Sequence, residues 1–211
     1  MTLRRTKQMR EQGTVHPTRD LIVDAAARIM KEKGVAGLHI DDVLEATGLT
    51  RGAMYHHFKN VDDLRESALL ATYAEGVDAN ISYVRNVLAS SKTAEEFRQG
   101  VLQANTQYTQ NESLRAVRKL RAHAMAVTAT ASALTEKLAH EQQRLTDEYI
   151  AVITEAQQKG WVKDSVSPHA LATFIQAYSF GVIVDDVSER HIEVQEWAKL
   201  IATFFETAIF T

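Results

Sequence analysis

The chain has 211 residues, of which 45% are hydrophobic and 24% are charged, a composition that is sufficient for a globular core. It contains no cysteine, which excludes disulfides, thiolate nucleophiles and cysteine-based metal sites. The net charge of −3 is unevenly distributed: residues 1–65 carry 11 basic and 9 acidic side chains, whereas residues 66–211 carry 13 basic and 18 acidic ones. The amino-terminal end is therefore the place to look for contacts with nucleic acid.

Residues 1–17 form a polar, basic and aperiodic segment that we expect to be a flexible arm. Its basic residues, from Arg4 to Arg10, are compatible with a solvated tail or with an arm that adds phosphate contacts to a DNA complex. No apolar run follows them, so the segment is not typical of a secretory signal. The longest uncharged run, residues 165–184, is too polar to span a membrane. We therefore expect a cytoplasmic protein with no membrane partner.

Residues 18–62 predict three short helices. Thr18 is the expected N-cap of the first helix, whose apolar residues recur with helical spacing and which Gly34 ends with a left-handed residue. A second helix is expected over residues 39–47. This pattern is typical of the first two helices of a helix-turn-helix.

The third helix is predicted to follow a sharp turn at Gly48, with Thr50 as its N-cap. Successive helical residues are about 100° apart, so Met54 and Phe58 face the core. The opposite, outward arc of the helix contains Arg51, Gly52, Tyr55 and His56. A short helix with such a face is typical of a recognition helix that lies in a DNA groove.

Residues 63–211 predict a larger helical region without a convincing pair of strands. The segment from Ala122 to Ala133 is compatible with a helix or with a loosened connection. The expected landmarks are a helix start near Asp62, a capping box at Thr93–Glu96, a junction at 111–113, a stop at Gly160, a start at Ser167–Pro168 and a last helix over 192–209. The predicted fold class is all-α, with about nine helices in total.

One series of residues runs through the amino-terminal third of the chain: Leu21, Ala25-Ala26, Gly34, Ile40, Asp42-Val43, Gly48-Leu49-Thr50, Gly52, Met54-Tyr55, His57-Phe58 and Leu64. Through this series the chain resembles the TetR family of bacterial transcriptional regulators. Two positions depart from the family's usual pattern. Leu38-His39 stands where a Thr or Ser opens the second helix, and Val61 replaces a lysine that contacts a DNA phosphate. Lys59 and Asn60 are the alternative sources of that contact.

The resemblance implies a repressor that binds a palindromic DNA operator as a dimer and is released by a small-molecule effector. Arg51 is the best candidate for base recognition, since a guanidinium can bond guanine O6 and N7 together. Gly52 permits a close approach to the duplex, and Thr50 offers its hydroxyl or amide to a phosphate. The predicted DNA-binding residues are His39, Thr50, Arg51, Gly52, Ala53, Tyr55, His56, His57 and Lys59.

The resemblance also implies that residues 63–211 enclose an effector pocket and dimerise through the last two helices. The candidate pocket residues combine apolar bulk with polar tips and are Phe97, Tyr108, His123, Met125, Tyr149, Phe174 and Tyr178. The candidate interface residues are Phe174, Tyr178, Val182, Trp197, Leu200, Ile201, Phe204 and Phe205. The alternative for both sets is that these aromatic residues belong to the chain's own core.

We expect neither enzymatic activity nor a metal or cofactor. The sequence lacks a nucleophile elbow, a P-loop, a dinucleotide fingerprint and a zinc-protease motif. The pair His56-His57 does not suit a metal, because adjacent helical residues point in different directions. The carboxylate pairs Asp41-Asp42 and Asp185-Asp186 are expected to be solvated at helix ends. A purely structural protein is the other alternative, but it would leave the outward face of the third helix without a role.

Overall fold

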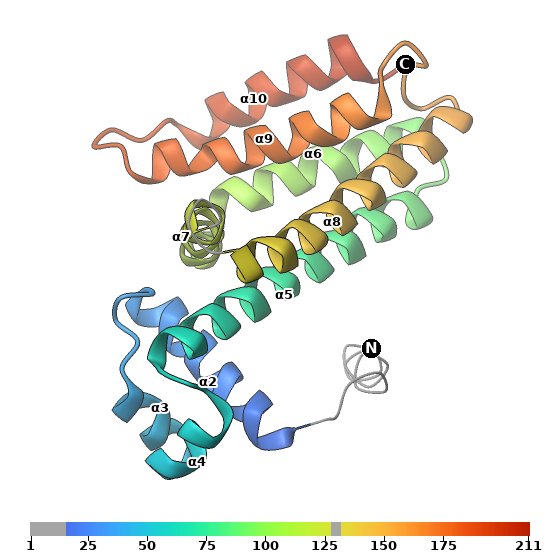
Figure 1. Cartoon of the computed structure of the whole chain (residues 1–211). Helices are drawn as coiled ribbons and strands as arrows, with labels where there is room; N and C mark the ends of the chain where they lie inside the picture. The colour runs from blue at the N-terminus through green and yellow to red at the C-terminus, as the bar shows by residue number, and fades with distance from the viewer. Residues whose placement is uncertain (1–15, 128–131) are drawn as a thin grey trace. The chain divides into compact units, whose positions relative to one another are not determined.

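The computed structural model describes residues 16–127 and 132–211 (Figure 1). Within these residues the chain forms nine α-helices, a π-helical turn and one isolated β-bridge between Val162 and Phe210. This confirms the all-α fold expected from the sequence. The basic residues of the predicted arm, Arg4 to Arg10, lie outside the described residues. The described helices include none with the length and apolarity needed to cross a membrane.

The chain divides into two compact units, Met1–Ala71 and Thr72–Thr211, which we call unit 1 and unit 2. The boundary falls inside a long helix, α5. The helices are α2 (Pro17–Lys33), α3 (Ile40–Thr47), α4 (Arg51–His57), α5 (Val61–Ser90), α6 (Ala94–Gln110), α7 (Glu112–Val127), α8 (Ser132–Gln158), α9 (Pro168–Asp186) and α10 (Val194–Phe204), followed by the π-helical turn η1 (Phe205–Ile209).

The turns of unit 1 follow from local backbone chemistry. Gly34 has a φ of 78° and ends α2, and Gly48 has a φ of 69° and ends α3. Glycine adopts these positive φ values without the strain that a side chain would introduce. Thr50 then caps α4, because its Oγ1 accepts a hydrogen bond from the Ala53 N–H at 3.2 Å. These three predictions are confirmed.

The start of α2 differs from the prediction. The helix begins at Pro17, and His16 occupies the N-cap position without a side-chain capping bond, so the assignment of Thr18 as the N-cap is wrong. Proline lacks the N–H that would be unsatisfied in the first turn, and its fixed φ suits the first helical position.

The core of unit 1 is formed by α2, α3, α4 and the first turns of α5. Met54 and Phe58, at the two ends of one face of α4, have almost no exposed surface. The Arg19 guanidinium lies over the Phe58 ring, 5.0 Å from its centroid, and donates to Ser67 Oγ at 3.0 Å. The other fully buried side chains of this core are Ile22, Ala26, Met30, Leu38, Val43, Leu64 and Ala68.

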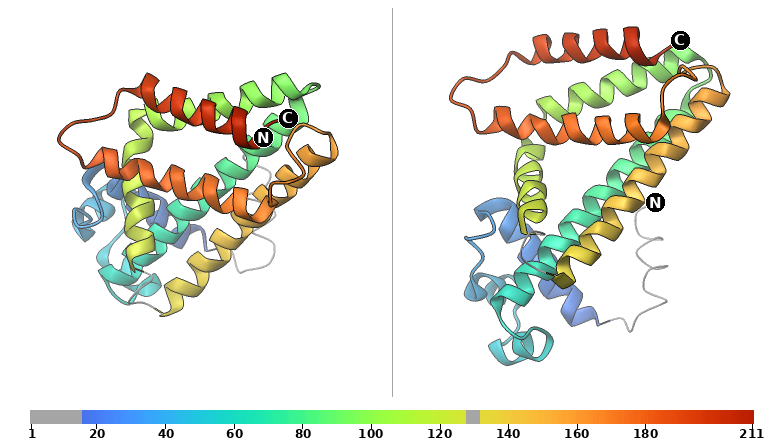
Figure 2. Two further views of the ribbon diagram at one scale, coloured as in Figure 1. Left: turned by 90° about the horizontal axis from the view of Figure 1, so that it is seen from above. Right: turned by 45° about the horizontal axis from the view of Figure 1, so that its top comes forward.

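Unit 2 is a bundle of long helices (Figures 1 and 2). The second part of α5 runs alongside α8, and α9 runs alongside α10. α9 packs on α8 and α7, while α10 packs on α6. The core at the carboxy-terminal end of the bundle contains Leu88, Phe97, Val152, Ile153, Ala156, Val162, Leu171, Ala172, Ile201, Phe205, Ile209 and Phe210.

The predicted helix starts in unit 2 are confirmed at two positions. Thr93 Oγ1 accepts from the Glu96 N–H at 3.2 Å, and Ser167 Oγ accepts from the Ala170 N–H at 3.3 Å. Gly160, with a φ of 70°, marks the predicted stop after α8. The undecided segment is helical from 122 to 127, and residues 128–131 lie outside the description.

Some apolar residues of the last two helices are left uncovered by the chain. Phe174 on α9 and Leu200 and Phe204 on α10, which the sequence assigned to an interface or alternatively to the chain's own core, are exposed. α10 also ends at Phe204, and a π-helical turn completes the segment that was predicted as a single helix. Periodicity alone does not distinguish a helix face that packs on the same chain from one that remains uncovered.

The side chain of Asp186 was expected to be solvated, but it is only 8% exposed. Arg118, which is equally buried, donates from Nε and Nη2 to the two Asp186 carboxylate oxygens, each at 2.7 Å. Its Nη1 donates to the Tyr108 carbonyl oxygen at 2.9 Å, so one guanidinium ties the end of α6 and α7 to the end of α9. Arg115 Nη2 adds a hydrogen bond to the Asp186 carbonyl oxygen at 2.6 Å.

The ion pair between Arg118 and Asp186 predicts a specific dependence of stability on pH. The hydrogen bond from Arg118 holds the pKa of Asp186 below its usual value of about 3.9. The pair therefore stabilises the fold fully above that value, and its contribution is lost as the pH falls through the lowered pKa. Asp186→Asn should destabilise the protein by ~3 kcal/mol at pH 7, because it leaves a buried guanidinium without its counter-charge.

Urea unfolding between pH 7 and pH 3 measures this effect. The stability difference between wild type and Asp186→Asn should shrink below about pH 4. Glu189→Gln, which neutralises an exposed carboxylate nearby in sequence, is the control and should change stability little. A difference that stays constant down to pH 3 contradicts the assignment.

Candidate nucleic-acid interface

The exposed face of α4 is the candidate interface in unit 1. The turn at Gly48 and the cap at Thr50 set the start of the helix, and the burial of Met54 and Phe58 sets its rotation. As predicted, the opposite side is exposed, and Tyr55 leaves 47% of its surface open. The residues that share this exposed side are Thr50, Arg51, Gly52, Tyr55 and His56.

Gly52 has no role in packing within the described chain. A Cβ built at this position would have a single neighbour within 4 Å, Thr50 Oγ1 at 3.9 Å. Its φ is also not positive, so alanine could take its place without backbone strain. Glycine inside a helix costs about 0.5–1 kcal/mol relative to alanine. The described contacts and the backbone conformation therefore give no reason within the fold for a glycine at this position.

Arg51 forms an ion pair with Asp41, which joins the first turn of α4 to the first turn of α3. Both side chains are largely exposed. The sequence predicts Arg51 on the outward face of α4 and Asp41 as a solvated carboxylate at a helix end, with no contact between them. The two residues are ten positions apart on separate helices, and only the angle between the helices brings them together.

Three histidines meet beside the interface. The ring centroids of His56 and His57 are 5.1 Å apart, and those of His57 and His16 are 6.1 Å apart. His57 is half-buried by these contacts, whereas His56 remains exposed. In the part of the chain that the structure describes, no group of three histidine, cysteine or carboxylate side chains is arranged to hold a metal ion.

The residues at the two ends of the candidate interface differ in whether their side chains are free for an outside contact. His39 is exposed at the N-cap position of α3, and its side chain does not cap the helix. After α4, the Asn60 side-chain oxygen accepts from the Asp63 N–H at 2.9 Å and so caps α5. Lys59 is exposed, and its backbone N–H donates a hydrogen bond to Asp63 Oδ2 at 3.0 Å. Of the two alternatives for a phosphate contact, Lys59 thus presents the cation. Ala53, also predicted, is half-buried.

The predicted effector residues of unit 2 do not form one group. Phe97 belongs to the core, where its ring centroid lies 5.5 Å from that of Trp161 and 6.3 Å from that of Phe210. His123 is exposed, and Met125 is half-buried. Four residues remain: Tyr108 on α6, Tyr149 on α8, and Phe174 and Tyr178 on α9.

These three tyrosines share one environment. Burial raises the pKa of the Tyr149 phenol to about 12, with a further rise from Tyr108. Burial also raises the pKa of Tyr178, and Tyr149 and Tyr108 add to that shift. The Tyr178 ring centroid lies 5.5 Å from that of the exposed Phe174. Of the predicted set, Phe174 and Tyr178 are thus in ring contact, and Tyr108 and Tyr149 act electrostatically on Tyr178.

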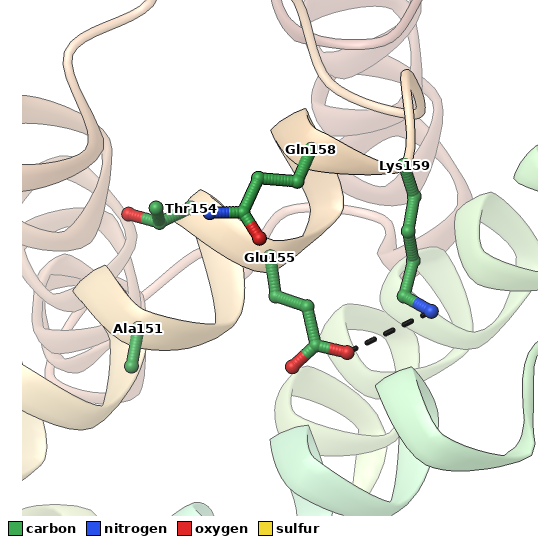
Figure 3. A pocket seen from close by; sticks show the side chains of 5 residues that line it. All are labelled: Ala151, Thr154, Glu155, Gln158 and Lys159. Atoms are coloured by element: carbon green, nitrogen blue, oxygen red, sulfur yellow. Dashed lines mark ion pairs between the residues drawn. The ribbon is translucent and has the colours of Figure 1, made fainter.

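An open depression of about 500 Å³ on unit 2 lies elsewhere (Figure 3). Its lining comes from the carboxy-terminal turns of α8 and the residue that follows them, and Glu155 and Lys159 form an ion pair at 3.7 Å. The lining residues are Ala151, Thr154, Glu155, Gln158 and Lys159. None of the predicted effector residues lines it.

The predicted interface residues of α9, α10 and η1 divide into three groups. Val182, Ile201 and Phe205 are buried within the chain itself. Tyr178 and Trp197 are half-buried and pack against the core. Phe174, Leu200 and Phe204 are exposed, and the ring centroids of Phe174 and Phe204 are 4.8 Å apart.

Comparison with known proteins connects these observations to a family. Residues 22–68 match the profile described as "Bacterial regulatory proteins, tetR family". The regulator AcrR of Shigella flexneri is 39% identical over 61 residues, which are 29% of this chain and 26% of AcrR. The regulator TtgR of Pseudomonas putida is 39% identical over 67 residues, which are 32% of this chain and 30% of TtgR. This chain thus matches between a quarter and a third of the length of these curated relatives.

The fold of the whole chain is similar to that of solved structures. A Saccharomonospora viridis protein, solved in complex with choline, aligns with a TM-score of 0.71 over 92% of this chain and 97% of its own. The two sequences are 18% identical, so the likeness concerns the fold alone.

Proposed function

We propose that this chain belongs, through residues 22–68, to the tetR family of bacterial regulatory proteins. On this premise, it is a non-enzymatic transcriptional repressor that acts in the cytoplasm. Residues 18–62 would bind a palindromic operator, and residues 63–211 would form the dimer and bind a small-molecule effector. The observation that carries the proposal is the exposed face of α4. Arg51, Gly52 and Tyr55 are exposed on this face, and no neighbouring atom of the described chain requires position 52 to be a glycine.

The chemistry of this face suits a DNA major groove. The Arg51 guanidinium can bond two acceptors of one guanine, and the Tyr55 hydroxyl can donate to a phosphate or a base edge. Lys59, Thr50 and His39 stand at the margins, where they can contact the phosphate backbone. A helix of seven residues reads few base pairs, so two copies related by two-fold symmetry are needed for a long site.

The surface formed by α9, α10 and their connection supports the proposal that two copies of the chain form a dimer. Among the described residues, six of the eight large hydrophobic side chains that are exposed lie here: Phe174, Val184, Val187, Ile192, Leu200 and Phe204. Exposed apolar residues concentrated on one surface are typical of a protein interface, whereas scattered ones are normal for a monomer. We assign this surface to a homodimer, with Phe174, Leu200 and Phe204 as its contacts.

The tyrosine cluster supports an effector site inside unit 2. The phenols of Tyr149 and Tyr178 are withdrawn from water, and the Tyr178 ring lies beside that of Phe174, so they offer hydrogen bonds within an apolar surrounding, the combination that small-molecule sites use. The S. viridis protein with a similar fold was solved in complex with choline, a small molecule. We assign Tyr108, Tyr149 and Tyr178 to the effector, which would act by favouring a conformer that binds the operator less well.

The DNA-binding proposal is tested with a duplex that the wild-type protein selects from a random pool. Arg51→Ala should lower the preference for this duplex over a shuffled one by roughly 5–150-fold, as expected for the loss of a bidentate base contact. Gly52→Ala should fold at least as stably as wild type, because its Cβ is unobstructed, yet bind the selected duplex more weakly. Fluorescence anisotropy and urea unfolding measure the two effects.

Arg28→Ala is the matched control for this series. Arg28 is exposed on α2, so the variant removes the same charge without changing α4. If Arg28→Ala and Arg51→Ala weaken binding equally, or if the wild type selects no sequence, the proposed function is wrong.

The dimer proposal predicts that one charge on α10 separates the protomers. Leu200 is 59% exposed, so Leu200→Asp should leave the fold intact while placing an unpaired carboxylate in the interface. Sedimentation velocity should find a wild-type dimer and a variant monomer. The control is Leu21→Asp in unit 1, where the leucine is 47% exposed on α2. A monomeric wild type, or a Leu200→Asp variant that remains dimeric, argues against the interface.

The effector proposal predicts that one compound affects both Trp197 and DNA binding. The ring centroid of Trp197 lies 6.5 Å from that of Tyr178, so its fluorescence should report ligands in the cluster. A set of small apolar compounds with one or two polar groups can be screened with the Trp161→Phe variant. A binding compound should weaken the complex with the selected duplex roughly 5–150-fold. Ligands that bind at the cluster without any effect on DNA affinity would count against the proposal.

A further inference from the structure

Asp41 lies on the face that the proposed function assigns to DNA, although a carboxylate is repelled by phosphates. It belongs to the first turn of α3, and its partner Arg51 opens α4. We propose that Asp41 is a positioning residue that orients the Arg51 guanidinium for base recognition, and thereby determines sequence specificity. This inference rests on the proposed DNA-binding function and adds a residue to it.

The geometry of the ion pair leaves Arg51 free to act. The contact joins Arg51 Nη2 to Asp41 Oδ1. Within the described residues, this is the polar contact that the Arg51 side chain makes. Guanidinium presents five donors in a rigid planar fork. One anchored donor therefore restricts the direction of the group while the remaining donors stay available for a base edge. With 55% of its side chain exposed, Arg51 is accessible to a duplex even while it is paired.

The pair contributes little to the stability of the fold, because both partners are exposed to water. Its effect is on the side chain itself. An arginine has many rotamers, and an unrestrained one on this surface would also reach phosphate oxygens, which carry no sequence information. Asp41 biases Arg51 toward one direction and reduces its availability for phosphates. The bias favours discrimination between sequences over affinity for DNA in general.

The carboxylate also has an electrostatic cost that can be measured separately. The Asp41 side chain is 81% exposed, so it repels the backbone of any duplex that approaches the face. Removing its charge should raise affinity for all DNA. The positioning role predicts something more, namely a loss of preference for the correct sequence. These two effects distinguish orientation from simple repulsion.

The chain provides a matched control in the next residue. Asp42 lies in the same first turn of α3 and carries the same charge, but its carboxylate pairs with Lys33 Nζ at 2.9 Å on the end of α2. Asp42→Asn therefore removes one negative charge a single residue away without touching Arg51. Comparison of Asp41→Asn with Asp42→Asn separates the loss of charge from the loss of the contact with Arg51.

The experiment measures dissociation constants by fluorescence anisotropy for the full-length variants at several salt concentrations. The probes are a duplex that the wild type selects from a random pool and a shuffled duplex of equal composition. Asp41→Asn should bind the shuffled duplex about threefold more tightly and lose roughly fivefold or more of the wild-type discrimination, because the orientation of a base-reading arginine is released. Asp42→Asn should shift affinity for both duplexes by the same factor.

Two further variants establish that the effect passes through Arg51. In an Arg51→Ala background, Asp41→Asn should leave discrimination unchanged, since there is no guanidinium to orient. Asp41→Glu, which keeps a carboxylate within reach, should retain more discrimination than Asp41→Asn. Thermal melting checks that each variant is folded; the exposure of the pair predicts little change in Tm.

The inference is overturned if Asp41→Asn changes both affinities equally, as Asp42→Asn does, or if it still lowers discrimination in the absence of Arg51. A wild type that selects no sequence instead refutes the proposed function, and the inference with it. That result appears before any variant is compared, so the two failures are distinguishable.

Discussion

The structure of unit 1 depends on the burial of one face of a helix that is too short to be stable alone. α4 has seven residues, and isolated helices of fewer than about 12–15 residues are marginal in water. Met54 and Phe58 supply the missing stability, since complete burial of such side chains contributes about 1.5–3 kcal/mol each. Because they face inward, the other side of α4 must face outward. The tertiary packing that makes the helix stable also leaves Arg51 and its neighbours exposed.

Two arginine–aspartate pairs show how burial decides what an ion pair does. Arg118 and Asp186 are almost completely buried, so their pair acts on stability and ties α7 to the end of α9. Arg51 and Asp41 are exposed, so their pair contributes little to the fold and instead influences where a mobile side chain points. The residue types are the same in both pairs. Their surroundings assign one to structure and the other, in our proposal, to recognition.

Local chemistry explains which features of the fold could be predicted from the sequence. The turns at Gly34 and Gly48 need positive φ values, and the caps at Thr50, Thr93 and Ser167 satisfy N–H groups within three residues. Such requirements involve residues that are close in the sequence, so they can be predicted from the sequence. The outward face of α4 was also predictable, because a single buried side defines the opposite one. The start of α2 was missed because Pro17 and Thr18 offer competing signals for the same helix end.

The sequence by itself determined the all-α fold, most helix boundaries and the surface of α4 that carries Arg51, Gly52 and Tyr55. Only the tertiary structure decided which aromatic residues of α9, α10 and η1 are covered: Phe174 and Phe205 were both interface candidates, but Phe174 is exposed and Phe205 is buried by its neighbours. The tertiary structure also decided which acidic residues form ion pairs. Asp186 pairs with Arg118, 68 positions away, and Asp41 pairs with Arg51 on the next helix. Contacts between distant segments depend on how helices pack, and helical periodicity does not encode which partner each face will find.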